Sequence, residues 1–383
     1  MNFLLLQIRA AGLKLDGEEK VSDILKYNQA KVGIFQLISE KNLQIGERIP
    51  PERELVERFD LSLITLRRAM HELEQEKIIR RVPRQGTFLN RPIRKVPVLG
   101  TILYIRIYKE EYGERFSADG LRPQVETVMK EHHFNVIYRN AMRPDLELAK
   151  MAASCTGIFV SGWLDDEWLA VLQSLGRPLV VIGDNPYSEK LPTVTFDFAE
   201  AAELLYDELL RRGCDTIGFI NGGDTYVPAK WMYVGFQAAA KRAGRRVPPE
   251  SVIWSSQTRI ADDISGFLAK NPDLDGLLVE CGELDALLAA LWHTDYPRKL
   301  KIAAIVESRD MVRPLLLLPD AIVAQFEKNM VPAAADMMLS LLKSGRKPAS
   351  LRLHAFVTTP KKAHENFIAE YRNSLSNPKY KNS

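Results

Sequence analysis

The sequence is poor in cysteine and contains no long apolar run. Its cysteines, Cys155, Cys214 and Cys281, are odd in number and far apart, which favours free thiols in a reducing compartment over a disulfide framework or a zinc site. No apolar stretch approaches the roughly 18–20 residues that span a bilayer. The N-terminal block is broken by Gln7 and Arg9 and has no basic residue ahead of it, unlike a secretory signal. We therefore expect a cytoplasmic protein without a membrane partner.

Patterns that support catalysis are also scarce. The turn GFINGGD lacks the spacing of a P-loop or of a dinucleotide fingerprint, so an ordinary strand-end turn is the simpler interpretation. His132 and His133 are adjacent, and neighbours rarely face one ion. No Gly-x-Ser-x-Gly elbow occurs. The sequence predicts no catalytic residue, no metal site and no cofactor, which makes an enzyme the less favoured class.

Positive charge is concentrated near the N-terminus. The 383 residues carry a net charge of +3, yet residues 23–95 hold 15 Lys or Arg against 10 Asp or Glu, a net +5, and residues 96–383 carry −2. A basic module on a mildly acidic body is typical of a polyanion-binding head with a separate sensing or catalytic body. A solvated charged surface would give the same count, so charge alone leaves both interpretations open.

The sequence pattern over residues 23–90 predicts three helices and a small hairpin. Pro51 suits the first turn of the second helix, and Ser62 is a good N-cap for the third. The segment IIRRVPRQGTFLN predicts two short strands around residues 83–86. Apolar residues recur at three- and four-residue spacing, as in helices packed on a core, at Val32, Phe35, Leu37, Ile38, Leu66, Ala69, Met70 and Leu73.

The spacings in this module resemble the GntR-type winged helix-turn-helix. They read Gly46…Ile49-Pro50-x-Glu52-Arg53-Glu54-Leu55…Leu61-Ser62-x-x-Thr65-Leu66-Arg67-x-Ala69…Leu73-Glu74…Gly86-Thr87-Phe88. The resemblance implies a cytoplasmic bacterial transcription regulator, nucleoid-associated when bound, that binds double-stranded operator DNA as a homodimer. The third helix would enter the major groove and the wing would lie at the minor groove. The candidate DNA contacts are Arg53, Leu63, Ile64, Thr65, Arg67, Arg68, Arg84, Gln85, Gly86 and Thr87.

Each of these residue types suits a DNA contact for a physical reason. The planar fork of Arg67 matches a guanine edge or a phosphate, and Arg53 matches a backbone-gripping arginine of the family. Gly86 would let the wing backbone approach DNA where a Cβ would not fit. The family often has Arg-Thr where this chain has Leu63 and Ile64, which can contact only thymine methyl groups. Two alternatives remain open: Leu63 and Ile64 could pack locally against the first helix, and Arg53 and Arg67 could be surface charges without a role in DNA binding.

An extended linker is expected at residues 91–97. The sequence pattern over residues 98–360 then predicts an α/β body. Short apolar runs of buried-strand type alternate with amphipathic segments, which indicates parallel sheets covered by helices. These runs are VLGTILYI, FNVIY, TGIFVSG, RPLVVIG, TVTF, TIGFING, DGLLVE and KIAAIV. They are too many for one ordinary sheet, so we expect two lobes. GRKPASLRLH predicts a closing return strand. Residues 361–383 are predicted to be a polar tail, disordered at its end, and residues 1–22 an extension of unknown role.

The order of the stretches TGIFVSG…RPLVVIGDN, VTFD…LLRRGCDTIGFINGG and YVGFQAAAKRAG resembles the LacI-type regulator core, which shares its fold with type I periplasmic sugar-binding proteins. The resemblance implies two Rossmann-like lobes with a ligand cleft. GntR-type heads on LacI-type bodies occur among sugar-responsive regulators, including arabinose-responsive repressors, and this chain looks like that group.

Ligands of open α/β sheets bind at the carboxyl ends of the strands. Loops at these ends hold aromatic residues that could stack on a sugar ring, carboxylates that could accept its hydroxyls, and further polar or apolar neighbours. The candidates are Tyr112, Phe116, Ser117, Trp163, Asp184, Asp197, Trp231, Met232, Glu280, Glu283, Glu307 and Gln325. Each could equally be an ordinary loop residue, and Asp197 could simply cap a helix.

Two departures leave the nature of the ligand open. Family members that bind sugars usually have an arginine where this chain has Met232, three residues before Gly235, and an aspartate near Gly282 is missing, with Glu280 and Glu283 nearby. The effector could be a small polar molecule other than a simple sugar, or the pocket could have lost its ligand. The sequence therefore predicts a ligand-controlled DNA-binding repressor, with an effector-free regulator or architectural DNA-binding protein as the alternative.

Overall fold

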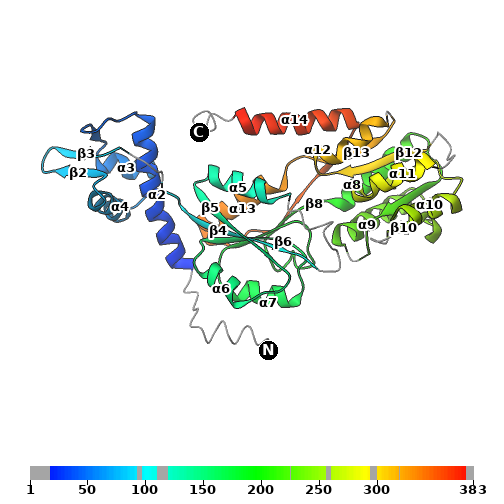
Figure 1. Cartoon of the computed structure of the whole chain (residues 1–383), viewed down its shortest axis with the longest axis horizontal. Coiled ribbons are helices and arrows are strands. Elements are labelled where there is room, and N and C mark those ends of the chain that lie inside the picture. Colours follow the sequence, from blue (N-terminus) through cyan, green and yellow to red (C-terminus); the bar gives the residue numbers. More distant parts are fainter. Residues whose placement is uncertain are drawn as a thin grey trace. The chain divides into compact units, whose positions relative to one another are not determined.

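The computed structural model describes residues 18–92, 97–109, 120–224, 226–255, 260–293, 300–318 and 320–376 (Figure 1). They form two compact units. The first comprises the residues up to 182 together with 187–193 and 331–350, and the second comprises 183–186, 194–330 and the residues from 351 onward. Within these described ranges, no helix has the length and apolar character needed to cross a membrane.

The first unit begins with a winged helical head, as predicted. Ser62 caps the third helix by accepting a hydrogen bond from the Thr65 backbone amide at 3.1 Å. The strands of the wing sheet pair antiparallel in the order β1-β3-β2, and only the two-residue β1 was not predicted. The elements are α2 (Glu18–Glu40), β1 (Arg48–Ile49), α3 (Glu52–Phe59), α4 (Leu63–Gln75), β2 (Ile79–Val82) and β3 (Gly86–Leu89).

The predicted apolar faces form the core of this head. All four inward residues of α4 are fully buried, and α2 adds its own apolar face to the same cluster. Burying an aliphatic side chain contributes about 1.5–3 kcal/mol, so the packing of α4 on α2 accounts for much of the stability of the head. The outward face of α4 is thereby held in one orientation.

The first helix also contacts the α/β lobe of the same unit. The Asn28 side-chain amide donates to the Leu99 carbonyl oxygen at 2.9 Å, and the Gln36 amide nitrogen lies 2.7 Å from Nε2 of His133. A backbone hydrogen bond from Leu99 to His133 joins the two contact points. The sequence pointed only to the linker at 91–97 as the connection, and residues 93–96 of that linker lie outside the described residues.

The α/β lobe of the first unit has four parallel strands in the order β7-β6-β4-β5. Helices that pack on this sheet bury Trp168 and a set of aliphatic side chains against it. The elements are β4 (Gly100–Ile107), α5 (Arg122–Glu131), β5 (Phe134–Ala141), α6 (Leu146–Ala153), β6 (Gly157–Gly162), α7 (Asp166–Ser174), β7 (Leu179–Ile182) and α13 (Met330–Ser344).

The second unit contains a six-stranded sheet in the order β10-β9-β11-β12-β13-β15, parallel except for β15. In addition, β8 (Thr193–Phe196) pairs in parallel with β14 (Leu351–Leu353). The other strands are β9 (Ile217–Asn221), β10 (Val252–Trp254), β11 (Gly276–Val279), β12 (Lys301–Val306), β13 (Ile322–Phe326) and β15 (Ala355–Thr358). The helices are α8 (Phe198–Arg211), α9 (Val227–Arg242), η3 (Pro249–Ser251), α10 (Ile260–Lys270), η4 (Cys281–Glu283), α11 (Leu284–His293), α12 (Arg309–Val312), η5 (Pro314–Leu317) and α14 (Pro360–Ser376).

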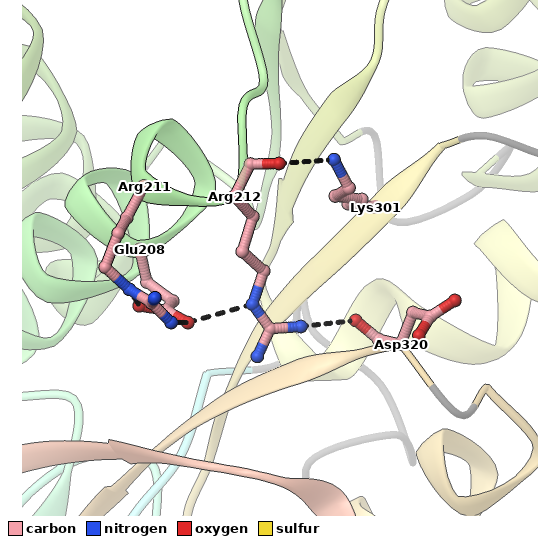
Figure 2. A network of polar contacts seen from close by, with 5 residues as sticks. All are labelled: Glu208, Arg211, Arg212, Lys301 and Asp320. Atoms are coloured by element: carbon pink, nitrogen blue, oxygen red, sulfur yellow. Dashed lines mark hydrogen bonds and ion pairs between the residues drawn. The ribbon is translucent and has the colours of Figure 1, made fainter.

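A polar network fixes the end of α8 at the amino edge of this sheet (Figure 2). Arg212 donates to Glu208 at 2.8 Å and to the backbone oxygen of Asp320 at 3.0 Å, and Lys301 donates to the Arg212 carbonyl at 2.6 Å. Because charged hydrogen bonds are stronger than neutral ones, this network ties α8 to the starts of β12 and β13. It leaves the opposite, carboxyl edge for binding.

All eight predicted strands of the body are confirmed, and so is the return strand near residue 351. The polar segment at 361–376 is helical, so the disorder expected for the end of the chain is wrong at residues 373–376. This segment is the helix α14, because Ala363 is buried and Phe367 packs on the core at helical spacing. Residues 377–383 lie outside the described part of the chain.

Candidate functional site

The outward face of α4 presents two aliphatic side chains to solvent. Leu63 is 40% exposed and Ile64 is 82% exposed, and neither belongs to the buried core of the head. The capped start of α4 holds them rigidly, and Thr65 adds a hydroxyl 2.8 Å from the Ser62 hydroxyl. This arrangement is suited to apolar contact with thymine methyl groups in a major groove.

Arginines surround this exposed face. Arg67 donates through Nε to Glu52 at 2.9 Å, and Glu52 is also within 3.5 Å of Arg81. Arg53 is 93% exposed at the start of α3, whereas the guanidinium of Arg68 lies 5.1 Å from the ring centre of Tyr27. Arginines thus lie beside the exposed face of α4, and Glu52 pairs with both Arg67 and Arg81.

The tip of the wing is a strained turn. Arg84 has φ 62° and Gly86 has φ 120°, a region that glycine adopts readily and arginine does not. A Cβ on Gly86 would meet only the flexible end of the Arg48 side chain, with Nε at 2.6 Å, so the positive φ is the reason that the fold of the wing favours glycine here. The exposed side chain of Gln85 sits between them, and Thr87 is half-buried in β3.

The predicted ligand residues are divided among several places. Tyr112, Phe116 and Ser117 lie outside the described residues. Trp163 belongs to the first unit, where its ring lies 5.3 Å from Nζ of Lys109. The remaining candidates belong to the second unit.

Three carboxylates of the second unit share one electrostatic environment. Burial raises the pKa of Glu307 to about 7, and the charge of Asp184 raises it further in the same direction. Burial likewise raises the pKa of Asp184 to about 6, opposed by a Thr195 hydrogen bond and by Arg352, and reinforced by Asp197. Among the described residues, Oδ2 of Asp184 is buried without a hydrogen-bond partner. These groups can accept hydrogen bonds from a ligand.

Asp197 serves the fold, as the alternative interpretation held. Its Oδ1 accepts a hydrogen bond from the Glu200 amide at 3.0 Å and caps α8. Glu200 in turn accepts from the backbone of Ala355 at 2.9 Å. The contribution of Asp197 to the site is its negative charge beside Asp184.

An arginine and a tryptophan lie beside these carboxylates. The guanidinium of Arg352, on β14, lies 4.9 Å from the ring centre of Trp231, on α9. This is a cation–π contact, and Trp231 is half-buried. Arg352 supplies positive charge near Asp184.

Several candidates do not face an open surface. Met232 is 1% exposed and packs in the core, and Glu283 is 5% exposed and accepts from the Ser255 hydroxyl at 2.8 Å. Glu280 folds back onto the Gly282 amide at 2.9 Å. Gln325 is 2% exposed and accepts a hydrogen bond from Asn366 of α14 at 2.9 Å. The structure therefore does not place Met232 where a ligand could reach it.

A small cavity adjoins Glu307 at the carboxyl ends of β8, β12 and β13. The rings of Phe196 and Phe326 stack beside it with centres 3.9 Å apart and planes at 10°. Its lining residues are Phe196, Val306, Glu307, Phe326, Lys328, Asn329 and Phe367. An aromatic wall with a protonatable carboxyl group suits a ligand with both apolar and hydroxyl faces.

Two family models match the chain. Residues 156–363, more than half of its length, match the periplasmic binding proteins and sugar binding domain of the LacI family, and residues 26–89 match the bacterial regulatory proteins of the gntR family. The chain belongs to the LacI-type sugar-binding family. Its N-terminal head is of the GntR type.

One curated relative of this LacI-type chain is the arabinose metabolism transcriptional repressor of Geobacillus stearothermophilus. The two are 27% identical over 218 residues, which make up 54% of this chain and 59% of the relative. The match thus spans about three fifths of the length of that relative.

Three solved structures share the fold. The cellobiose complex of the transcriptional regulator CelR has a TM-score of 0.56 at 16% identity, covering 78% of this chain and 89% of that one. The transcription regulator CcpA of Lactococcus lactis has a TM-score of 0.54 at 18% identity, covering 68% and 97%. The glucose-galactose binding protein GanP of Geobacillus stearothermophilus has a TM-score of 0.54 at 18% identity, covering 70% and 99%.

The sequence reasoning missed Arg352, Asn366 and Phe367. Arg352 lies in the predicted return strand, but nothing in the chain order places it beside Trp231. The signal for the other two was the helical spacing of Ala363 and Phe367 after Pro360, a residue favoured in a first helical turn. The polar composition of the flanking residues obscured it.

Proposed function

We propose that this chain is a bacterial, cytoplasmic transcription repressor that binds operator DNA as a homodimer. The observation that carries the proposal is the exposed, rigidly capped face of α4, with Ile64 82% exposed and Arg67 beside it. The GntR-type match of the head supports it. An exposed aliphatic residue on a basic helix face has little use in water and a clear one in a major groove.

In this proposal the head reads DNA in two ways. Arg67 exchanges Glu52 for a guanine edge or a phosphate, while Leu63 and Ile64 select thymine methyl groups. Arg53, Arg84 and the rest of the basic wing attract phosphates without regard to sequence, so their contribution falls as salt rises.

The proposed effector is a small polar molecule of the sugar type. Asp184 and Glu307 would accept its hydroxyls, and the Trp231 ring and the phenylalanine wall would cover its apolar faces. The LacI-type match of the body and the arabinose repressor among the relatives support this class. Ligand binding would shift operator affinity by its differential affinity for the two states of the protein, typically 1–3 kcal/mol.

The DNA part is tested by selecting bound fragments from sheared genomic DNA of the source organism at one fixed salt concentration and sequencing them. We expect a two-fold-symmetric motif enriched upstream of a few genes, because a homodimer binds two half-sites. Uniform, salt-sensitive recovery of all fragments would contradict the repressor proposal and favour an architectural DNA-binding protein.

A second candidate, a regulator without an effector, is favoured by one observation. Met232 lies in the core and Gln325 is sealed by Asn366, so two expected ligand positions face no open surface. Calorimetric titration of the full chain with L-arabinose, D-galactose and cellobiose separates the candidates. Binding that also changes operator affinity supports the effector proposal, and intact operator binding without any sugar response supports the alternative.

A further inference from the structure

The C-terminal helix α14 supplies side chains to the cavity beside Glu307. Phe367 lines this cavity, and the preceding residue, Asn366, donates to Gln325. Both residues lie beyond residue 363, where the match to the LacI-type family model ends. The helix therefore brings two side chains from outside the family core to the carboxyl ends of β12 and β13.

The helix is firmly seated in this position. Ala363 is fully buried, Phe367 packs on the core cluster of the second unit, and α14 contacts α12, η5 and β13 (Figure 1). The side chain of Asn366 satisfies Gln325, which is 2% exposed and would otherwise be a buried amide without this donor. Removing the helix would thus expose both apolar surface and a polar group.

The space that remains is small. With Phe367 in place, the cavity beside Glu307 has room for about one water molecule. Phe367 is half-buried and closes one side, while Phe196 and Phe326 form a stacked wall on another. The Phe367 ring therefore limits the space for a ligand group that enters this cavity beside Glu307.

We infer that α14 is a wall of the ligand site, in which Phe367 and Asn366 are specificity-determining residues that limit ligand size. This inference rests on the proposed ligand site. Phe367 would set how far a ligand extends past Glu307, and Asn366 would hold Gln325 out of reach of the ligand. A monosaccharide would be accepted more readily than a disaccharide.

A thiol reporter tests the wall without requiring any ligand. Glu307→Cys is introduced into the full chain together with Cys281→Ser, because the other two cysteines are buried. Labelling by a small methanethiosulfonate and by a bulky maleimide dye is then timed. Phe367→Ala should raise the labelling rate of the bulky reagent by about tenfold and that of the small reagent by less. Phe367→Trp should lower both labelling rates.

Matched variants separate this effect from unfolding. Glu365→Ala changes an exposed residue of the same helix and should leave both labelling rates unchanged. Asn366→Ala should raise the rates by less than Phe367→Ala does. Equal rates in the Phe367→Ala, Phe367→Trp and unsubstituted reporters would overturn the inference, as would a common increase for both reagents accompanied by loss of the folded far-UV spectrum.

A sugar titration distinguishes failure of the inference about α14 from failure of the proposed function. In the native-cysteine background, Phe367→Ala should improve cellobiose binding relative to L-arabinose. If no sugar binds any variant while the reporter responds as expected, the sugar effector fails and the wall stands. Sugars could also bind while substitution of Phe367 changes neither the labelling rates nor the preference for cellobiose. In that case the inference about α14 is wrong and the effector proposal stands.

Discussion

Replacing Glu307 by glutamine should stabilise the protein above neutral pH. The folded state raises the pKa of Glu307 from 4.5 to about 7, first because the group is buried and second because Asp184 is negative. Between these values the folded state holds a proton that the unfolded chain releases. The free energy of unfolding therefore falls as pH rises through this window and levels off above about pH 7.

The magnitude follows from the displacement of the pKa. A displacement of about 2.5 units corresponds to roughly 3 kcal/mol at 1.36 kcal/mol per unit, and solvent contact of the half-buried group reduces this. We expect Glu307→Gln to gain about 1–3 kcal/mol over the unsubstituted protein at pH 8. At pH 4.5 the two should differ little, because a protonated carboxyl group and an amide are both neutral.

The assay is urea unfolding of both proteins at pH values from 4.5 to 8, with the difference in unfolding free energy plotted against pH. Asp310→Asn is the control, because Asp310 lies close by in the first turn of α12 with 76% of its side chain exposed. Its difference from the unsubstituted protein should not vary with pH. A Glu307→Gln difference that is constant across this range, or a variant less stable at pH 8, would refute the reasoning.

Four further predictions concern the head and the second unit. Arg67→Ala should cost about 1–3 kcal/mol of operator affinity and relax sequence preference in a binding titration, whereas Arg211→Ala, in the body, should change neither. Ile64→Ala should leave unfolding unchanged and abolish discrimination between thymine and uracil in the operator. Ser62→Ala should lower the stability of the head by about 1 kcal/mol in thermal unfolding. Gly235→Ala should destabilise the second unit by about 2 kcal/mol or more, because its Cβ would lie 2.1 Å from a backbone oxygen of α8.

Local sequence patterns predicted much of the head correctly. The spacing of Leu66, Ala69, Met70 and Leu73 fixed the inward face of α4, and the Ser62 cap was predicted and found. These features depend on neighbours within a few turns, so they can be read from the order of residues. The ion pair of Arg67 with Glu52 joins two helices, and no local pattern predicted it.

In the body, local patterns predicted the strands but not the interactions between distant segments. Its eight predicted strands were recognisable because buried parallel strands are continuous apolar runs, and Asp184 and Glu307 were identified because strand ends are predictable. Their altered pKa values depend on burial and on each other's charge, which arise only when distant segments meet.

The sequence by itself determined the two-part organisation, the inward and outward faces of α4 and the strands that carry the acidic residues, because each of these follows from short-range periodicity. Only the tertiary structure decided which of those residues share a site. It buried Met232, set Arg352 against Trp231 and brought Phe367 of α14 to the cavity beside Glu307. Such contacts join residues far apart in the chain, and they are selected by the packing of the whole unit rather than by any local preference.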